Sequence, residues 1–237
     1  KGHILNLMNQ WWMERTSHII PNHVVHFDGN YLIAKKCRLI PLEIIVRSYM
    51  TGSTSTSLWT HYKNGTRNYC GIDFPDGLEK NRPLPELAIT PTTKGEVDEL
   101  ISRQEILERQ VVTEQELDFI YEKALELFRF GQRVADERGL ILVDTKYEFG
   151  YDINGNIILI DEVHTCDSSR YWRKDTYQER VDNGQEPQKL DKDACRDYVK
   201  SKCDPYNDPI PDIPVEEQDK VCACYSELYE RLTGETF

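Results

Sequence analysis

The sequence predicts an α+β fold in which antiparallel strands are flanked by helices and two lobes share a cleft. Strand-sized apolar runs occur at residues 40–46 and 156–160, between turn signals. Asn154-Gly155 is the strongest short hairpin signal, and a hairpin is an antiparallel pair. Helical spacing of apolar residues appears near both termini and before residue 138. At 237 residues the chain can bury a sizeable core as one large domain or two small ones.

The first elements are a helix and three strands. Apolar residues at helical spacing predict an amphipathic helix over residues 3–18, which Pro21 ends. Residues 23–27 and 31–37 flank the turn signal Asp28-Gly29-Asn30 and predict a hairpin, and residues 39–50 continue as a strand. From Thr51 to about Thr93 the sequence predicts a loop-rich segment, and so long a loop is usually functional.

The second half contains the most clearly marked helix. Thr113 and Glu116 form a capping box, so a helix is predicted over residues 114–138. A strand pair follows over residues 141–165, then a polar stretch from about 173 to 190. Two helices close the chain, the last running from Pro214 to Thr233-Gly234.

Composition excludes several classes of protein. Lys+Arg number 29 against 41 Asp+Glu, and the net charge of −12 argues against nucleic acid as a partner. Because no apolar run reaches about 18 residues, no membrane span is expected. The first twelve residues lack signal-peptide features, and the seven scattered cysteines are interpreted as reduced, so a cytoplasmic location is predicted. The sequence leaves the oligomeric state open between monomer and homodimer.

The charged positions of the strand pair are the first candidate site. Asp144, Lys146 and Glu148 are two apart, so they share one face of a strand. If Asn154-Gly155 are the whole hairpin loop, Glu148 lies directly opposite Asp161. Opposed carboxylates repel unless a cation lies between them, and Mg²⁺ suits such oxygen ligands together with substrate phosphates. The predicted site is therefore a metal and phosphate site, with Lys146 within reach of a phosphate or acyl oxygen.

A solvated strand face with alternating charges is the alternative. The opposite face carries Val143, Tyr147 and Phe149, and the return strand is apolar nearly throughout. Charges on a strand inside a core line a cleft more often than they meet water.

Other candidates lie outside this hairpin. Glu43, Arg47 and Ser53 belong to residues 40–53, where a strand breaks into a glycine- and hydroxyl-rich turn suited to an anion. The alternatives are a flexible surface loop after residue 50 and an ordinary surface ion pair for the arginine. Asp167 and Arg170 directly follow the charged strand pair, and such an acid and arginine suit an amino-acid or carboxylate substrate.

Two further groups carry less information. Lys94 and Asp98 precede the helices and are either site residues or an exposed helix start. The six histidines show no ligand spacing, so none of them is assigned a role in catalysis.

Three segments in order resemble the signature segments of the SAICAR synthetase family. They are IPLEIIVRSYMTGS at 40–53, LVDTKYEFG at 142–150 and DEVHTCDSSRYW at 161–172. The resemblance implies the family's two-lobed, ATP-grasp- or kinase-like fold. It also implies an ATP- and Mg²⁺-dependent ligase that joins L-aspartate to carboxyaminoimidazole ribotide (CAIR). The products are SAICAR of purine biosynthesis, ADP and phosphate, and the reaction passes through an acyl phosphate.

The resemblance also implies roles for the charged face and the flanking segments. Lys146 and Asp144 match the catalytic-face lysine and aspartate, and Glu148 and Asp161 match the Mg²⁺ ligands. The remaining positions match substrate sites: Arg47 and Ser53 the ribotide phosphate clamp, Asp167 and Arg170 the surroundings of the substrate carboxylates, Lys94 and Asp98 the nucleotide and ribose, and Glu43 the adenine.

The chain departs from the family pattern at its beginning. The family opens with a small lobe whose glycine-rich strand covers the ATP phosphates, and this sequence starts after it. Residues 1–43 are predicted as the remainder of that lobe and residues 44–237 as the larger lobe with the substrate and Mg²⁺ sites. Smaller departures are Val97 and Cys166, where the family often has His and Pro.

Two other functions stay open at this point. The first is a nucleotide- or ribotide-binding module without turnover, for which the missing glycine-rich strand argues. The second is a phosphotransferase, against which the absence of HRD and DFG segments argues.

Overall fold

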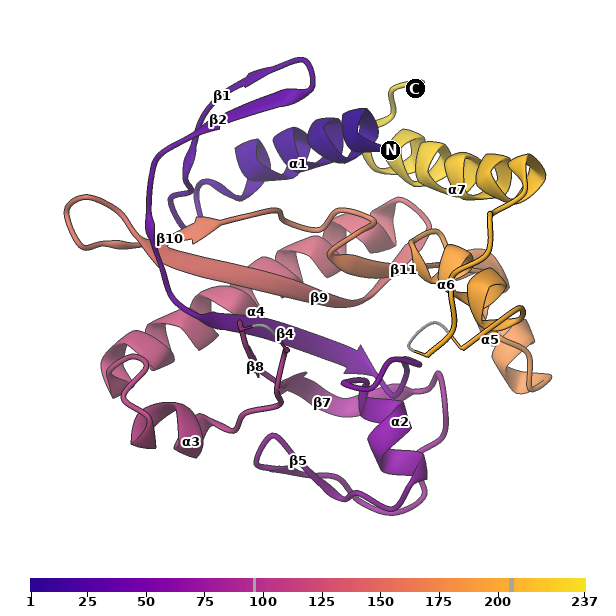
Figure 1. The fold of residues 1–237 in the computed structure, drawn as a ribbon, viewed down its shortest axis with the longest axis horizontal. Coiled ribbons are helices and arrows are strands. Elements are labelled where there is room, and N and C mark those ends of the chain that lie inside the picture. Colours follow the sequence, from indigo (N-terminus) through magenta and orange to yellow (C-terminus); the bar gives the residue numbers. More distant parts are fainter. Residues whose placement is uncertain (96, 205–206) are drawn as a thin grey trace.

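A computed structural model describes residues 1–95, 97–204 and 207–237 of the chain. Its centre is a seven-stranded antiparallel sheet built around the long strand β9 (Figure 1). The strands that pair with β9 (Leu140–Tyr151) are β3 (Arg38–Leu39), β4 (Leu42–Tyr49), β10 (Ile157–Ile160) and β11 (Ser169–Arg173). On its other side β4 pairs with β7 (Pro83–Ile89) and β8 (Thr92–Thr93).

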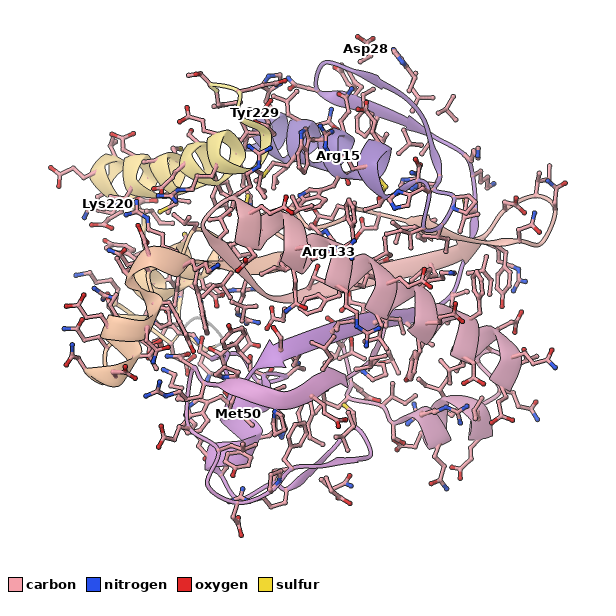
Figure 2. All side chains as sticks on the ribbon, turned by 180° about the vertical axis from the view of Figure 1, so that it is seen from behind. Arg15, Asp28, Met50, Arg133, Lys220 and Tyr229 are labelled. Atoms are coloured by element: carbon pink, nitrogen blue, oxygen red, sulfur yellow. The ribbon has the colours of Figure 1, made fainter. Side chains whose placement is uncertain are left out.

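The long helix α4 (Glu114–Glu137) packs across the sheet against β9 and β4. Figure 2 shows it from behind, with the exposed Arg133 on it. The predicted capping box is confirmed, because Thr113 and Glu116 bond to each other's backbone N–H groups. The apolar stripe of α4 enters the main core through Leu117, Ile120, Ala124, Leu127 and Phe128.

The two ends of the chain lie together. Helices α1 (Gly2–Thr16) and α7 (Val215–Thr233) pack side by side (Figure 1). The rings of His3 and Phe237 are 5.7 Å apart. Both predicted helices are confirmed, and Gly234 ends α7 in the left-handed conformation, with φ of 80°.

The shorter elements surround this frame. They are the hairpins β1 (Val24–Asp28) with β2 (Tyr31–Ala34) and β5 (Asn68–Tyr69) with β6 (Ile72–Asp73), and the helices α2 (Leu58–Lys63), α3 (Arg103–Glu108), α5 (Lys174–Asp182) and α6 (Asp193–Lys200). The predicted hairpin around Gly29 is confirmed, since Asp28 pairs with Tyr31. The α+β class is therefore confirmed. No helix among the described residues has the length and apolar character needed to cross a bilayer.

Short elements occur in two segments where none was predicted. The segment from Thr51 to Thr93 contains α2 and the strands β5 to β8, and the polar stretch from 173 to 190 contains α5. These elements have two to nine residues, which is too short for a clear hydrophobic period. Tertiary contacts hold them instead: Leu58, Tyr62 and Tyr69 belong to a second, smaller core cluster.

The predicted register of the β9–β10 hairpin is wrong by one residue. Glu148 pairs with Ile160, and Asp161 lies beyond the end of β10. The cause is the loop: Asp152 N–H donates to the carbonyl of Asn156 (2.9 Å), which leaves three residues between them. Gly155, with φ of 82°, takes the left-handed position of such a three-residue loop.

The division into lobes after residue 43 stays a prediction. The first 43 residues contain α1 and the strands β1 to β3, and Ile4, Met8 and Trp12 of α1 belong to the main core.

Candidate active site

Strand β9 carries its charged side chains into the protein. Asp144 is 4% and Glu148 only 2% exposed, and Lys146 between them is partly buried. The alternative of a solvated strand face is therefore wrong. Buried charges need partners, and the three residues find theirs in two neighbouring clusters.

The first group is the lysine–carboxylate cluster, formed by Glu43, Lys94, Lys146, Glu148 and Asp161. Lys146 Nζ contacts a carboxylate oxygen of Glu148, lies 2.8 Å from Asp161 Oδ2 and 3.6 Å from Glu43 Oε1. Lys94 Nζ contacts the second oxygen of Glu148. Glu148 and Asp161 thus share one ammonium group, although they are not the directly opposed pair that was predicted.

The charges of this cluster support one another. Burial acts to lower the pKa of Lys146, but Asp161 and Glu148 outweigh it and raise that pKa above its ordinary value. Burial likewise opposes ionisation of Asp161, yet Lys146 lowers its pKa. Burial raises the pKa of Glu43 against the opposing charge of Lys146. Lys146 is therefore an ammonium and Asp161 a carboxylate at neutral pH.

Asp161 reaches this cluster through its backbone conformation. In the observed register its side chain would alternate to the face of Tyr147, away from Lys146. Its φ of 64° lies in the left-handed region, which is uncommon outside glycine and concentrates at functional sites. This turn returns the carboxylate to the charged face.

The second group is the arginine–carboxylate cluster, formed by Arg47, Asp144, Arg170, Asp193 and Arg196. Asp144 Oδ2 accepts from Arg47 Nη1 (3.4 Å) and from Arg170 Nη1 (2.7 Å). Asp193 accepts from Arg170 Nε and from Arg196 Nη1, both at 2.7 Å. The side chain of Arg47 is only 4% exposed, so an ordinary surface ion pair is excluded.

A cavity of about 150 Å³ is lined by the arginine–carboxylate cluster and by Lys146 of the lysine–carboxylate cluster. Its walls come from strands β4 and β9, from the loops before α2 and after residue 166, and from the start of α6. The charged side chains that line it are Arg47, Asp144, Lys146, Asp167, Arg170, Asp191, Lys192, Asp193 and Arg196. Cations from four separate segments thus face one space, which suits an anionic ligand.

Three predicted site residues lie outside these contacts or at their margin. Ser53 is exposed, and Lys200 Nζ binds its hydroxyl at 2.9 Å. Asp98 is also exposed and acts on Glu43 through its charge. Asp167 lines the cavity, where Lys1 Nζ lies 2.9 Å from its Oδ1.

The loop after β4 contributes neighbours of Ser53. Thr54, Thr56 and Ser57 line the cavity, and the Thr56 carbonyl accepts from Arg47 Nη2 at 3.3 Å. Gly52, with φ of 101°, leaves the space that Ser57 fills, because a Cβ there would lie 2.5 Å from the Ser57 side chain. This turn therefore packs against the cavity on one side, while Ser53 and Ser55 are exposed.

Residues 191–196 are the part of the site that sequence analysis missed. The Asp191 carboxylate accepts from the backbone N–H groups of Tyr171 (2.8 Å) and Asp193 (2.7 Å) and so ties the start of α6 to β11. Burial and the charge of Asp193 raise the pKa of Asp191. The available signal was the dense alternation of acids and bases in DKDACR, directly after the apolar Leu190.

The comparisons with known proteins agree on one family. The family model described as SAICAR synthetase matches residues 1–213. The phosphoribosylaminoimidazole-succinocarboxamide synthase of Legionella pneumophila (strain Lens) is 50% identical over 240 residues, covering 100% of this chain and 77% of the relative. The chloroplastic enzyme of that name from Arabidopsis thaliana is 51% identical over 237 residues, covering 99% of this chain and 58% of the relative.

Solved structures show the same fold. The SAICAR synthase of Saccharomyces cerevisiae complexed with SAICAR superposes with a TM-score of 0.82 at 33% identity, covering 100% of this chain and 82% of that one. A type-2 SAICAR synthetase in complex with ADP gives 0.73 at 26% identity, with the same coverage. With a family match over most of the chain and a half-identical relative, the chain belongs to the SAICAR synthetase family.

Proposed function

We propose that this chain is the ATP-dependent ligase that joins L-aspartate to CAIR and releases SAICAR, ADP and phosphate. The observation that carries the proposal is the arrangement of β9. On one face of this strand, Asp144 belongs to the arginine–carboxylate cluster, and Lys146 and Glu148 belong to the lysine–carboxylate cluster. Asp144 and Lys146 both line the cavity. The relatives solved with SAICAR and with ADP bind a product and a nucleotide of this reaction.

The reaction consists of two transfers. The γ-phosphoryl group of ATP moves to a carboxylate oxygen of CAIR, and ADP leaves. The amine of L-aspartate then attacks the acyl carbon, a C–N bond forms, the bond to the phosphate oxygen breaks, and phosphate and one amine proton leave. Such chemistry depends on positioning and charge neutralisation. Lys146, held as an ammonium, supplies positive charge where the phosphoryl group passes, and Asp144 holds Arg47 and Arg170 in place.

Magnesium fits the lysine–carboxylate cluster. Glu148 and Asp161 both contact the ammonium of Lys146, so their oxygens converge on a position already occupied by positive charge. Two carboxylates together with substrate phosphates are the usual donors for Mg²⁺, which neutralises phosphate charge when bound. These two residues would hold the ion.

The remaining predicted residues keep their proposed roles at the edges of the site. Arg47 would bind the ribotide phosphate in the cavity, with Ser53 at the rim, and Arg170 with Asp167 would bind L-aspartate, the arginine through a carboxylate and the acid through the amine. Glu43, Lys94 and Asp98 would face the nucleotide from the other cluster.

The test is release of ADP by this chain with Mg-ATP, CAIR and L-aspartate, each omitted in turn. Release that needs all three supports the ligase. If neither this chain nor an N-terminally extended form releases ADP while CAIR still binds, the binding-module function replaces it.

We also infer a cytoplasmic location. All seven cysteines are free, as in a reducing compartment. Because the Arabidopsis relative is named chloroplastic, the location of a fluorescent fusion is the deciding measurement.

A further inference from the structure

The loop of residues 161–168, which we call the acid loop, joins β10 to β11 and carries Asp161 and Asp167 near its two ends. Asp161 belongs to the lysine–carboxylate cluster and Asp167 lines the cavity. His164 lies midway between them and is completely buried. Like Asp161, it has a left-handed backbone, with φ of 53°. Two such residues in one short loop require anchors that hold them.

Two tyrosine hydroxyls anchor His164. The Tyr147 hydroxyl shares a hydrogen bond with His164 Nε2, and the Tyr171 hydroxyl donates to the His164 carbonyl at 2.8 Å. Tyr147 lies between Lys146 and Glu148 on β9 but on the opposite face, and Tyr171 directly follows Arg170 on β11. The two strands that carry the site charges on one side of the sheet, β9 and β11, therefore hold the acid loop from the other side through these tyrosines.

The surroundings of His164 leave it little freedom. The ring of Trp12 lies edge-on with centroids 4.6 Å apart. A Cβ on Gly131 of α4 would lie 2.5 Å from His164 Cε1, so only glycine allows this approach. The Val163 N–H donates to Asn9 Oδ1 at 3.0 Å. Burial lowers the pKa of His164 to about 3, so the imidazole is neutral and one of its nitrogens can accept a hydrogen bond.

We propose that His164 is a positioning residue of the ligase. Its imidazole and its carbonyl, held by Tyr147 and Tyr171, fix the middle of the acid loop. Asp161 then meets Lys146 and Glu148, while Asp167 faces the cavity. The proposal rests on the proposed function for its kinetic consequence, and on the described contacts alone for the anchoring.

The experiment removes one hydroxyl at a time. Tyr147→Phe and Tyr171→Phe keep the buried rings and delete one anchor each. Tyr177→Phe is the matched control, because its hydroxyl also donates to a buried backbone carbonyl, that of Asn81, at 2.7 Å, outside the acid loop. Gly131→Ala is an additional variant that displaces the imidazole without removing a hydroxyl.

Two quantities are measured for each variant. The first is amide hydrogen exchange of residues 161–168 by mass spectrometry. The second is the set of steady-state constants, namely kcat and the KM values for L-aspartate, CAIR and ATP.

Faster exchange of the acid loop in both anchor variants, with a fall in kcat/KM for L-aspartate of roughly tenfold or more, supports the proposal, since small misplacements of reacting groups cost rate steeply. Gly131→Ala should behave in the same way, and Tyr177→Phe should match the wild type. Faster exchange with wild-type kinetics would overturn positioning, and wild-type exchange in both anchor variants would overturn the anchoring itself. If the wild-type chain shows no turnover, the proposed function fails, and the exchange measurement still decides the anchoring.

Discussion

Single acids on β9 and the acid loop are paired with cations. Asp161 shares the ammonium of Lys146 with Glu148, although it lies outside the strand and reaches the cluster through a left-handed backbone. In the proposed function the site uses the charge of Asp161, whereas an acid at the outer tip of a hairpin has no such role. That difference can be tested by replacing a carboxylate with its uncharged amide.

Asp161→Asn should lower kcat by roughly 100-fold or more, because a lost group at a developing charge typically costs that much. The fold should persist, since the amide has nearly the same shape. Steady-state turnover against Mg²⁺ concentration is the measurement. Asp28→Asn, at the outer tip of the β1–β2 hairpin (Figure 2), is the control and should match the wild type. Wild-type turnover of Asp161→Asn would remove this residue from the proposed metal site.

Arg47→Lys should raise KM for CAIR roughly tenfold and leave KM for ATP within twofold, since the planar guanidinium binds phosphate through two parallel hydrogen bonds and an ammonium does not. The positive charge is retained, so the change isolates geometry. Initial rates with each substrate varied in turn check this. An equal rise in both constants would show that the whole cavity is disturbed rather than the ribotide phosphate site.

At the scale of elements, α4 was predictable because its signals are local. Its apolar spacing and its capping box lie within consecutive residues, and the structure reproduces both. The register of the hairpin was not, because a left-handed Gly155 suits a two-residue and a three-residue loop alike. The short α2 and α5 depend on distant packing partners, which the local pattern does not contain.

Thr113→Ala should destabilise α4, and with it the protein, by about 1 kcal/mol at pH 7. The hydrogen bonds from Thr113 lower the pKa of Glu116, so the stability gained from this ionised acid is present above its unfolded pKa of about 4.3 and is lost as the pH falls through the folded value. The difference in Tm between variant and wild type should therefore shrink at pH 3. Thermal unfolding at both pH values checks it, and a constant difference would contradict the capping-box origin.

At the scale of the whole molecule, the core joins the two ends of the chain. Leu228 of α7 is fully buried in the same core as Trp12 of α1 and Leu117 of α4. The site also depends on contacts between residues far apart in sequence. Asp191 binds the backbone of Tyr171, and Asp193 binds Arg170. The sequence around the two acids does not show these partners, so both acids were missed. Sequence patterns predicted the long elements and the charged face. The proposed roles of the site residues come from the resemblance of three segments to a family, because local patterns do not contain them.

Leu228→Ala should lower the free energy of unfolding by about 2–5 kcal/mol, the usual cost of emptying a buried leucine site. Ile210→Ala, at a position that is 61% exposed, is the control and should change it by no more than about 0.5 kcal/mol. Urea unfolding of the two variants gives both values. Equal effects would show that α7 does not belong to the cooperative core.

The ammonium of Lys146 between Glu148 and Asp161 also bears on how the ligase handles its cofactor. If the two acids hold magnesium as proposed, this ammonium is an internal counter-ion, and removal of the metal by a chelator would leave no bare pair of acids. A free divalent ion would have to displace this tethered cation and would leave it unpaired. An ion that arrives already bound to a nucleotide brings phosphate oxygens, and the displaced ammonium of Lys146 can pair with them. With the roles proposed for Glu148 and Asp161, the resting site is therefore charged to take up the metal and the nucleotide together, as one ligand.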